Sequence, residues 1–438
     1  MPDELDELCA RVLAEHGCAS VSVAVAEGDE VVLARAYGFA DVASRRPATP
    51  GTVYGLASVT KAFTATAVCL AADEGLLDLD APASGAYGPT GPTPRQLLLH
   101  RGGFPAFYTF HYGAGPLPIE IERYRAPLRE PGTEFEYSNT GYQELGRLLE
   151  SATGRPLGDH LRERVAAPLG LSDFAFGAAY TGPAPVATRY SAGGRAYPTC
   201  RTGHPAATAG WATAADVALF ARTASRLLKP STLAAMNEAP AINEHTGYGY
   251  GRLVSHGPGP VVHSHGGGMG GIAAMMIDVP ERELSLAVLT NSTDKAARDA
   301  VVRHLAGALL PGFRPTQLDT AAETPRTVTL PQGTWSGEIT TPEGGLPLRL
   351  RLLSPTRLEV QLADAPPVTT AAAASDRWDL RATAALQLPT RDARLNSPHL
   401  GLELRLREDT LTGRAIAYKP GDQEGFLGSY LPHPCTLR

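Results

Sequence analysis

The chain has 438 residues and a mass of 46.1 kDa, which is enough for two large domains or about three of ordinary size. Its 43% hydrophobic and 19% charged residues, with 46 glycines and 37 prolines, are typical of a globular protein with many turns, and they exclude a disordered or fibrous chain. A net charge of −6 without a basic run argues against nucleic acid as the main partner. Only four of the 39 basic residues are lysines: Lys61, Lys229, Lys295 and Lys419.

The N-terminus has no basic start followed by an apolar stretch, and no apolar run reaches membrane-spanning length. The five cysteines are far apart and form no C-x-x-C pair, so we expect neither zinc nor a disulfide framework. We therefore predict a cytoplasmic protein without a membrane partner.

In chain order, the pattern predicts a helix over residues 3–16, a hairpin over 20–37 and a helix over 58–72. The middle, residues 80–245, mixes Gly/Pro-rich loops with helices at 141–152, 156–167 and 213–228. Strands at 251–255, 261–265, 272–279 and 284–290 precede a last helix at 294–310. Strands at both ends of a helical middle indicate one α+β domain, residues 1–312, whose sheet is completed by both ends.

The remaining residues change in character. Residues 313–332 are rich in Pro and Thr and are predicted to be a linker. In residues 333–438 leucines recur at every second position, for example Leu346, Leu348, Leu350 and Leu352. This period of two, with Gly/Pro/Asp turns, predicts a small antiparallel barrel or sandwich that serves as a cap or binding module.

The helix at 58–72 carries the first candidate for chemistry. Ser58 and Lys61 are one turn apart on the same face, and eleven uncharged residues follow Lys61. A buried lysine can lose its proton and act as the base that activates a hydroxyl, which arginine cannot do. The alternative is an ordinary helix cap beside a surface lysine. A lone lysine in an uncharged helix of an arginine-rich chain instead favours a catalytic role, with Ser58 as the nucleophile and Lys61 as its base.

The same spacing recurs in Ser292-Thr293-Asp294-Lys295. Here Lys295 stands close in sequence to Arg298, Asp299 and Arg303, and Ser292 or Thr293 are typical cap residues. We interpret this second copy as structural, with Lys295 on a solvated helix face.

A second candidate is Tyr137-Ser138-Asn139. A phenol beside a lysine can relay a proton, and an asparagine amide can hold the lysine and bind a substrate carbonyl. A packed tyrosine and a loop asparagine would give the same pattern, so this motif indicates a catalytic function only in combination with the other motifs.

The third candidate is the run from His263 to Gly271, HSHGGGMGG, at the end of one strand and before another. Glycines let the backbone run close along a substrate, and an N–H there can pair with that of Ser58 to bind an oxyanion. His265 would add a positive or proton-donating group. The run also fits G-x-G-x-x-G, but a strand follows instead of a helix, which argues against a dinucleotide site. His263 and His265 are two candidate metal ligands without a third, so we expect no metal and no cofactor.

Taken in this order, the three motifs resemble those of the serine β-lactamase and penicillin-binding-protein superfamily, in particular its class C-like branch of esterases and D-amino-acid peptidases. The resemblance covers about residues 5–310 and includes LLLHRGG at 97–103, PGTEFEYSNTGY at 131–142 and YGYG at 248–251. It implies an α/β sheet with a helical region and the active site between them.

The resemblance also implies roles. Ser58 would be the acylated nucleophile, Lys61 its proton partner, and Tyr137 the general base and acid. Asn139 and Gly267 would bind substrate, and the N–H groups of Ser58 and Gly268 would form the oxyanion hole. His265 stands where many relatives have Lys, whereas esterases, D-aminopeptidases and acyltransferases often have His, so we do not expect β-lactam resistance.

The C-terminal part resembles the lipocalin-like domain attached to some of these enzymes. Together with the expected location and the Gly/Pro-rich stretch at 102–117, it resembles the penicillin-binding-protein-type thioesterases, which take a peptide from a carrier-protein thioester and cyclise it, with acceptance of D-residues. We therefore predict a nonribosomal peptide cyclase. A cytosolic D-aminopeptidase or esterase is the alternative, and a non-catalytic ligand-binding relative is the third option.

Overall fold

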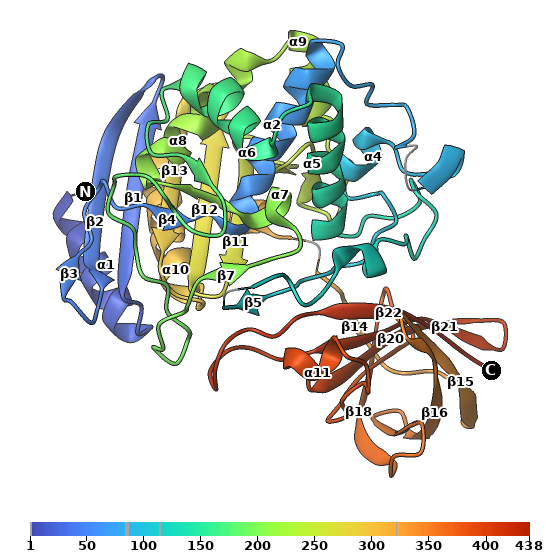
Figure 1. Cartoon of the computed structure of the whole chain (residues 1–438). Coiled ribbons are helices and arrows are strands. Elements are labelled where there is room, and N and C mark those ends of the chain that lie inside the picture. Colours follow the sequence, from blue (N-terminus) through green and yellow to red (C-terminus); the bar gives the residue numbers. More distant parts are fainter. Residues whose placement is uncertain (1, 84–86, 114, 321) are drawn as a thin grey trace.

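The first part of the chain is built around an antiparallel sheet, and the C-terminal part is a β-barrel (Figure 1). The computed structural model describes residues 2–83, 87–113, 115–320 and 322–438. Within them, the eight strands of the first sheet lie in the order β3-β2-β1-β13-β12-β11-β10-β9. Val21 of β1 lies opposite Thr290 of β13, so both ends of the domain complete one sheet, as predicted. The strands are β1 (Ser20–Glu27), β2 (Glu30–Asp41), β3 (Arg46–Pro47), β9 (Thr246–Tyr248), β10 (Leu253–Ser255), β11 (His263–Met269), β12 (Ile272–Val279) and β13 (Leu284–Thr290).

Helices cover both faces of this sheet. On one face α1 (Pro2–Glu15) and α10 (Ala296–Leu309) pack against each other and against the sheet; on the other lies α8 (Ala214–Thr223), with α2 (Thr60–Asp73) and α5 (Asn139–Thr153) in the layer that shares its core. Strands covered on both faces have no solvated side, which explains why β12 and β13 are buried throughout.

Shorter elements connect these layers. The helices are α4 (Pro94–Leu98), α6 (Leu157–His160), α7 (Pro205–Thr208) and α9 (Pro230–Asn237), and the single turns are η1 (Ala57–Val59), η2 (Gly88–Thr90), η3 (Ile121–Tyr124), η4 (Leu161–Ala166), η5 (Ala167–Leu169), η6 (Ala224–Leu227), η7 (Pro280–Arg282) and η8 (Pro315–Leu318). The short strands are β4 (Tyr54–Gly55), β5 (His111–Tyr112), β6 (Ala175–Phe176), β7 (Cys200–Arg201) and β8 (Gly210–Ala212).

Helix α2 is buried on every side, as its uncharged sequence predicts. Every residue from Thr60 to Ala71 is buried, and Phe63 stacks between Phe174 and Phe220. A helix that is apolar all round has no solvated face and belongs inside the protein. Lys61 is therefore carried into the interior by its neighbours in the sequence.

The segment 313–332, predicted to be a linker, is attached to both parts of the molecule. The Gln317 amide of η8 donates to the carbonyl of Pro260 at 2.7 Å, and the Thr246 hydroxyl donates to that of Asp319 at 2.7 Å. Further on, β14 (Pro325–Arg326) pairs with β18 of the barrel. The segment thus lies along the end of the first sheet before it enters the barrel.

The C-terminal strands form a closed up-and-down barrel, so of the barrel or sandwich predicted from the period-two leucines the barrel is present, in agreement with the resemblance to a lipocalin-like domain. Each strand pairs with the next, and β22 returns to β15, while β14 extends the sheet at β18. Leucines such as Leu350, Leu402 and Leu404 point into a packed interior. The strands are β15 (Thr334–Thr341), β16 (Gly344–Ser354), β17 (Arg357–Leu362), β18 (Val368–Ser375), β19 (Leu380–Ala384), β20 (His399–Arg407), β21 (Thr410–Tyr418) and β22 (Leu431–Leu437), and α11 (Ala393–Asn396) precedes β20.

The barrel contacts the first part through the loop that precedes β5. Tyr108 and Tyr430 exchange two backbone hydrogen bonds, of 3.1 and 2.8 Å, and Phe107 is buried in the hydrophobic cluster of the barrel. Ion pairs such as Arg405–Glu134 flank this contact. The barrel therefore supports a loop that also reaches the candidate active site.

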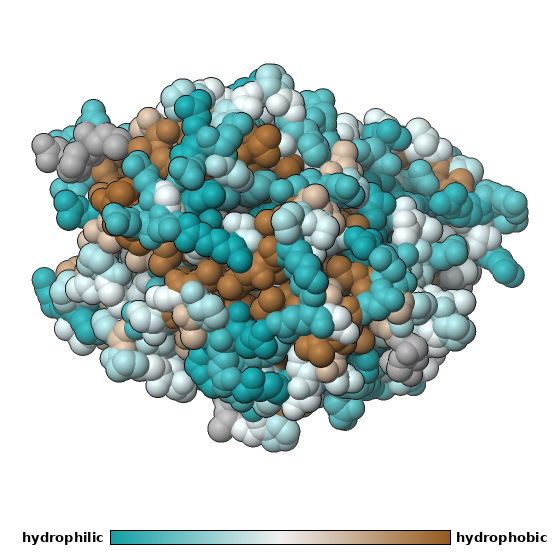
Figure 2. All heavy atoms as spheres, turned by 90° about the horizontal axis from the view of Figure 1, so that it is seen from above, coloured by the Kyte–Doolittle hydropathy of each residue, from teal (hydrophilic) through white to brown (hydrophobic). Residues whose placement is uncertain are grey.

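The surface seen from above is mostly hydrophilic, with hydrophobic side chains gathered in a band across its middle (Figure 2). None of the helices in the described residues is both long and apolar enough to span a membrane.

Candidate active site

Ser58 lies on a strained turn directly before α2. The preceding residue, Ala57, is fully buried and has φ of 45°, a left-handed conformation that is costly for a residue with a side chain. The turn is held from both sides, because the Leu56 N–H donates to the carbonyl of Gly210 and strand β11 packs against η1. Rigid packing thus fixes the position of the Ser58 hydroxyl.

Lys61 follows one turn later, and its amine is surrounded by three oxygen atoms. Nζ lies 3.2 Å from the hydroxyl of Ser58, 2.6 Å from Oδ1 of Asn139 and 3.2 Å from the carbonyl oxygen of Ala207. The side chain is fully buried, and this burial lowers the pKa of Lys61 well below its usual value. The structure therefore brings together the serine, lysine and asparagine predicted from two separate segments.

The partners of Lys61 suit a neutral amine. Asn139 is oriented by its Nδ2, which donates to the carbonyl of Phe107 at 3.1 Å, so that Oδ1 faces Lys61. This oxygen and the Ala207 carbonyl can only accept hydrogen bonds. A neutral amine has two N–H groups for these two acceptors and one lone pair, which is then left for the proton of the Ser58 hydroxyl.

Tyr137 lies on the other side of the lysine, just before α5. Its ring centroid is 4.7 Å from Nζ of Lys61. Loss of contact with bulk water raises the pKa of Tyr137 well above its usual value, although a hydrogen bond with Ser58 lowers it in part. The phenol is therefore protonated in the free site and can donate a proton beside Ser58.

His265 is buried at the cavity, and its role in catalysis stays a prediction. Its Nδ1 lies 2.8 Å from the carbonyl of Gly266, which can only accept, so Nδ1 carries a proton. Burial lowers the pKa of His265 to about 3, which favours the neutral ring. In that form Nε2 accepts from the hydroxyl of Tyr248 at 3.0 Å.

The glycine run forms the end of β11, and one edge of it is open. β12 pairs with β11 from His263 to Met269, whereas β10 pairs with it only at His263 and Ser264 among the described residues. A Cβ atom on Gly267 would lie 2.2 Å from the Leu56 carbonyl oxygen, so glycine is required where the strand passes the turn that carries Ser58. Gly268 follows on the open edge, where we predict that its N–H binds an oxyanion.

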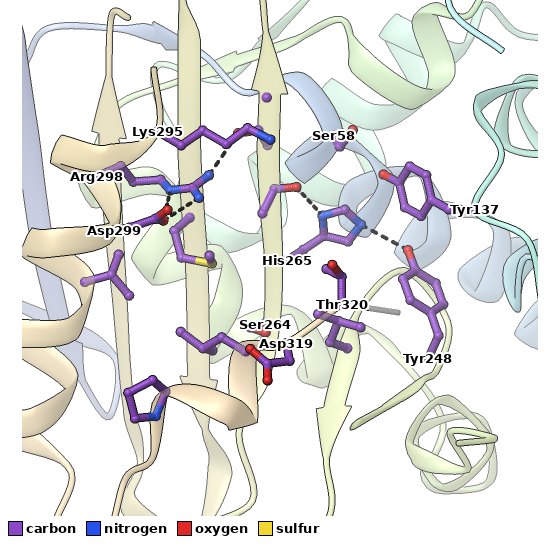
Figure 3. A pocket seen from close by; sticks show the side chains of 18 of the residues that line it. Ser58, Tyr137, Tyr248, Ser264, His265, Lys295, Arg298, Asp299, Asp319 and Thr320 are labelled. Carbon is purple, nitrogen blue, oxygen red and sulfur yellow. Dashed lines mark hydrogen bonds and ion pairs between the residues drawn. The ribbon is translucent and has the colours of Figure 1, made fainter. Parts of the chain in front are cut away.

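These residues line a cavity of about 580 Å³ (Figure 3). Its lining includes Ser58, Tyr137, His265, Gly267 and Gly268, together with residues at the start of α10, in η8 and directly after η8. In Figure 3, Lys295 reaches from α10 across the sheet to β11, and Tyr248 and Tyr137 lie on the opposite side.

The second Ser-x-x-Lys motif lies at an exposed helix start, as predicted, and this face also borders the cavity. Lys295 and Arg303 are exposed, and together with Arg298 and Asp299 they line the cavity. Arg298 alone of the four is buried, 6% exposed, and donates to the carbonyls of Gly267 and Ala274, at 3.2 and 3.0 Å.

Two aromatic residues of the site were not predicted. His100 packs against Tyr137 and Tyr248 in tilted ring contacts, with centroids 4.3 and 4.6 Å away, and its Nδ1 accepts from the backbone N–H of Ser138. Both His100 and Tyr248 lie in stretches that carried the family resemblance, but without a neighbouring reactive group in the sequence they had no assignable role.

The metal alternative finds no support in the part of the chain that the structure describes. There, no three His, Cys, Asp or Glu side chains converge in a way that could hold an ion. His263 faces Asp278, with Nδ1 3.7 Å from Oδ2, while His265 is occupied by Gly266 and Tyr248.

Comparison with known proteins identifies the class. Residues 5–310 match the family described as Beta-lactamase, which is more than two thirds of the chain. The chain belongs to this family, and it is a serine hydrolase or acyltransferase.

Individual relatives are similar over different lengths. A D-aminopeptidase of Brucella ovis is 34% identical over 162 residues, which is 34% of this chain and 31% of that protein, so the chain matches less than a third of its relative's length. The crystal structure of SurE with D-Leu covers 94% of this chain and 96% of SurE, with a TM-score of 0.65 and 22% identity. The octameric penicillin-binding protein homologue from Pyrococcus abyssi covers 100% and 99%, with a TM-score of 0.62 and 19% identity. Both structures share the fold over the barrel as well.

Proposed function

We propose that this protein transfers an acyl group from a peptide substrate through an ester on Ser58, and that it accepts D-residues. The observation that carries this proposal is the Lys61 amine, which is fully buried, lies 3.2 Å from the Ser58 hydroxyl and is bound otherwise by two acceptors only. That arrangement makes a base of the lysine and a nucleophile of the serine.

Acylation then proceeds as follows. Lys61 takes the proton of Ser58 as Oγ attacks the substrate carbonyl carbon, and the N–H groups of Ser58 and Gly268 bind the oxyanion that forms. As the intermediate collapses, the Tyr137 hydroxyl gives its proton to the leaving amine and regains one from Lys61. The C–N bond is broken, and the ester on Ser58 remains.

Deacylation reverses these proton movements. Water or an amine attacks the ester carbonyl, its proton passes to the Tyr137–Lys61 pair, and Ser58 leaves with a proton. Hydrolysis gives a free acid, whereas attack by an amine gives a new amide. The same residues serve both outcomes, so the acceptor that reaches the ester decides the product.

The hydrolytic reading, a D-aminopeptidase or D-peptide hydrolase, is supported by similarity to the Brucella D-aminopeptidase and by His265 at the position where many relatives have a lysine. The cyclase reading is supported by a cavity of about 580 Å³, within the range for ligands larger than one amino acid. We place hydrolysis first, and retain the macrocyclisation of a carrier-bound nonribosomal peptide as the second candidate.

Turnover of matched substrates tests the proposal. We expect wild type to release p-nitroaniline from D-alanine p-nitroanilide about 10-fold or more faster than from the L isomer, and Ser58→Ala to release none from either. Equal release by Ser58→Ala would overturn the nucleophile, and a preference for the L isomer would overturn the substrate class. With a peptidyl N-acetylcysteamine thioester that has a free amine, a linear acid supports hydrolysis, and a product lighter by one water supports cyclisation.

A further inference from the structure

The barrel holds the segment that leads into the active site at Tyr137. This Tyr137 segment, residues 134–138, forms neither a helix nor a strand before α5 begins. Three arginines of the barrel bind three consecutive residues of it. Arg405 of β20 forms a bidentate pair with Glu134 at 2.7 and 3.0 Å, Arg377 donates to the carbonyl of Phe135 at 3.0 Å, and Arg414 of β21 pairs with Glu136.

The other side of the Tyr137 segment is bound to His100. The Glu136 N–H donates to the His100 carbonyl at 2.8 Å, and the Ser138 N–H donates to the His100 ring at 3.1 Å. His100 is buried, and its ring packs against that of Tyr137. Tyr137 is therefore fixed between a buried histidine of the first part of the chain and the arginines of the barrel.

The arginines are themselves held in place around the buried indole of Trp378. The guanidinium groups of Arg405 and Arg414 lie 5.1 and 5.2 Å from its ring centroid, and that of Arg129 lies at 5.4 Å. Arg414 also donates to Glu403 of β20 at 2.6 Å. Because planar guanidinium groups stack on aromatic faces and bind carboxylates in a fixed geometry, this contact can determine the position of the Tyr137 segment closely.

The position of the Tyr137 hydroxyl matters because it gives its proton to the leaving amine in the proposed reaction. A displacement of a reacting group by about 1 Å can lower a rate by about 100-fold. The lining of the cavity, as far as the structure describes it, includes Phe135 and Tyr137 but no residue of the barrel strands. The barrel therefore reaches the chemistry through the Tyr137 segment, without contact with the substrate.

We propose that the barrel positions the general acid: Arg405 and Arg414 hold Glu134 and Glu136, and thereby keep the Tyr137 hydroxyl where it can protonate the leaving group. This inference rests on the proposed acyl transfer at Ser58. The two arginines are positioning residues, since they act on the reaction only through the Tyr137 segment.

Variants on both sides of the contact test this role. Arg405→Met and Glu134→Gln remove a partly exposed ion pair, and Arg414→Met removes the buried one. Arg351→Met is the matched control, because Arg351 forms a bidentate pair with Glu359 at 3.0 and 2.8 Å between two strands of the barrel. For each variant, kcat/KM for D-alanine p-nitroanilide, the rate of phosphonylation by a fluorophosphonate and a thermal unfolding curve are measured.

We expect Arg405→Met and Glu134→Gln to lower kcat/KM for the anilide by about 3- to 10-fold, and folded Arg414→Met by about 10-fold or more. Phosphonylation should change less than about 2-fold, because fluoride leaves without a proton, and Arg351→Met should stay within about 2-fold in both assays. Equal losses in the two assays, a similar loss in Arg351→Met, or no loss in Arg405→Met and Glu134→Gln would each overturn the inference.

A double-mutant cycle shows whether Arg405 acts through Tyr137. In Tyr137→Phe the phenol proton is already missing, so the addition of Arg405→Met should lower the remaining hydrolysis by less than about 2-fold. A further loss as large as that in the wild-type background would overturn the inference, because Arg405 would then act through another group.

Hydrogen exchange separates this inference from the proposed reaction, since it needs no turnover. In the peptide that contains residues 134–138, we expect the Glu136 and Ser138 N–H groups to exchange about 5-fold or more faster in Arg405→Met than in wild type, and at the wild-type rate in Arg351→Met. Faster exchange supports the positioning role even if wild type releases no p-nitroaniline. Unchanged exchange in Arg405→Met would overturn it while leaving the acylation of Ser58 unaffected.

Discussion

The chain contains the same Ser-x-x-Lys spacing twice, and the two copies differ in everything except spacing. Lys61 lies inside a helix without other charges and is fully buried, with Ser58, Asn139 and Ala207 as partners. Lys295 precedes a helix with a charged face, and its amine points into the cavity without a partner in the described structure. The four-residue spacing alone therefore does not decide whether a lysine acts as a base. Its burial and the type of its hydrogen-bond partners decide it.

The two serines differ as well. Ser58 lies at the cavity on the strained turn after Ala57, whereas Ser292 accepts from the backbone N–H of Asp294 at 3.2 Å within the loop before α10 and does not cap the helix as predicted. The first copy can therefore supply a nucleophile and a base, whereas the second supplies only a positively charged lysine at the cavity. The predictions below test this division of roles.

The largest difference is expected between the two serines. Ser58→Ala should lose acylation by roughly 10⁶-fold, because the bond to the acyl group can no longer form, while Ser292→Ala should stay within about 2-fold of wild type. Intact mass after incubation with a fluorophosphonate measures both. An adduct on Ser58→Ala at the wild-type rate would assign the nucleophile elsewhere.

Tyr137 should matter most where a leaving amine needs a proton. In Tyr137→Phe we expect amide hydrolysis to fall by about 10²- to 10³-fold, because the phenol proton is missing. Phosphonylation of Ser58 should fall much less, since fluoride leaves without a proton. Equal losses in the two assays would instead give Tyr137 a role in activating Ser58.

Replacement of Asn139 should reduce the acylation that depends on Lys61 more than it reduces the stability of the fold. Asn139→Ala removes the 2.6 Å acceptor of Lys61, so the amine loses its orientation toward Ser58, and we expect acylation to fall by about 10²-fold. Thermal unfolding is the control for a general loss of structure. Acylation at the wild-type rate in this variant would show that Asn139 is not needed to orient Lys61.

The pH dependence should follow the neutral lysine. Burial lowers the pKa of Lys61, and only the deprotonated amine accepts a proton, so kcat/KM should be constant at neutral pH and decrease on acidification through this lowered pKa. Because the pKa of Tyr137 is raised above its usual value, no decline is expected up to about pH 10. A rate that rises steeply between pH 8 and 10 would mean that Lys61 is an ordinary ammonium group.

Much of this site was predictable, for physical reasons. Ser58, Lys61, Tyr137 and Asn139 were found because a buried lysine next to a hydroxyl is a rare chemical situation, and because the order of three motifs matches a family. The barrel could be predicted from the alternation of leucines such as Leu350 and Leu352, because every second side chain of a strand points to the same face of the sheet, here the core.

What the sequence did not predict depends on tertiary contacts that a local pattern does not contain. The preference of His265 for the neutral form comes from its burial. The position of Lys295 at the cavity depends on where η8 and the end of β11 lie, because an exposed polar helix face beside a cavity has the same sequence pattern as one elsewhere on the surface.

The acylation rate of Lys61→Arg tests the central claim most directly, with Lys295→Arg as the matched variant. Arginine keeps the positive charge but does not deprotonate, so it cannot act as a base. Time-resolved intact mass with a fluorophosphonate, which reacts with the same Ser58 hydroxyl, alongside a thermal unfolding curve, should give phosphonylation about 10²- to 10⁴-fold slower for folded Lys61→Arg and near wild-type phosphonylation for Lys295→Arg. Folded Lys61→Arg that acylates as fast as wild type would contradict the account.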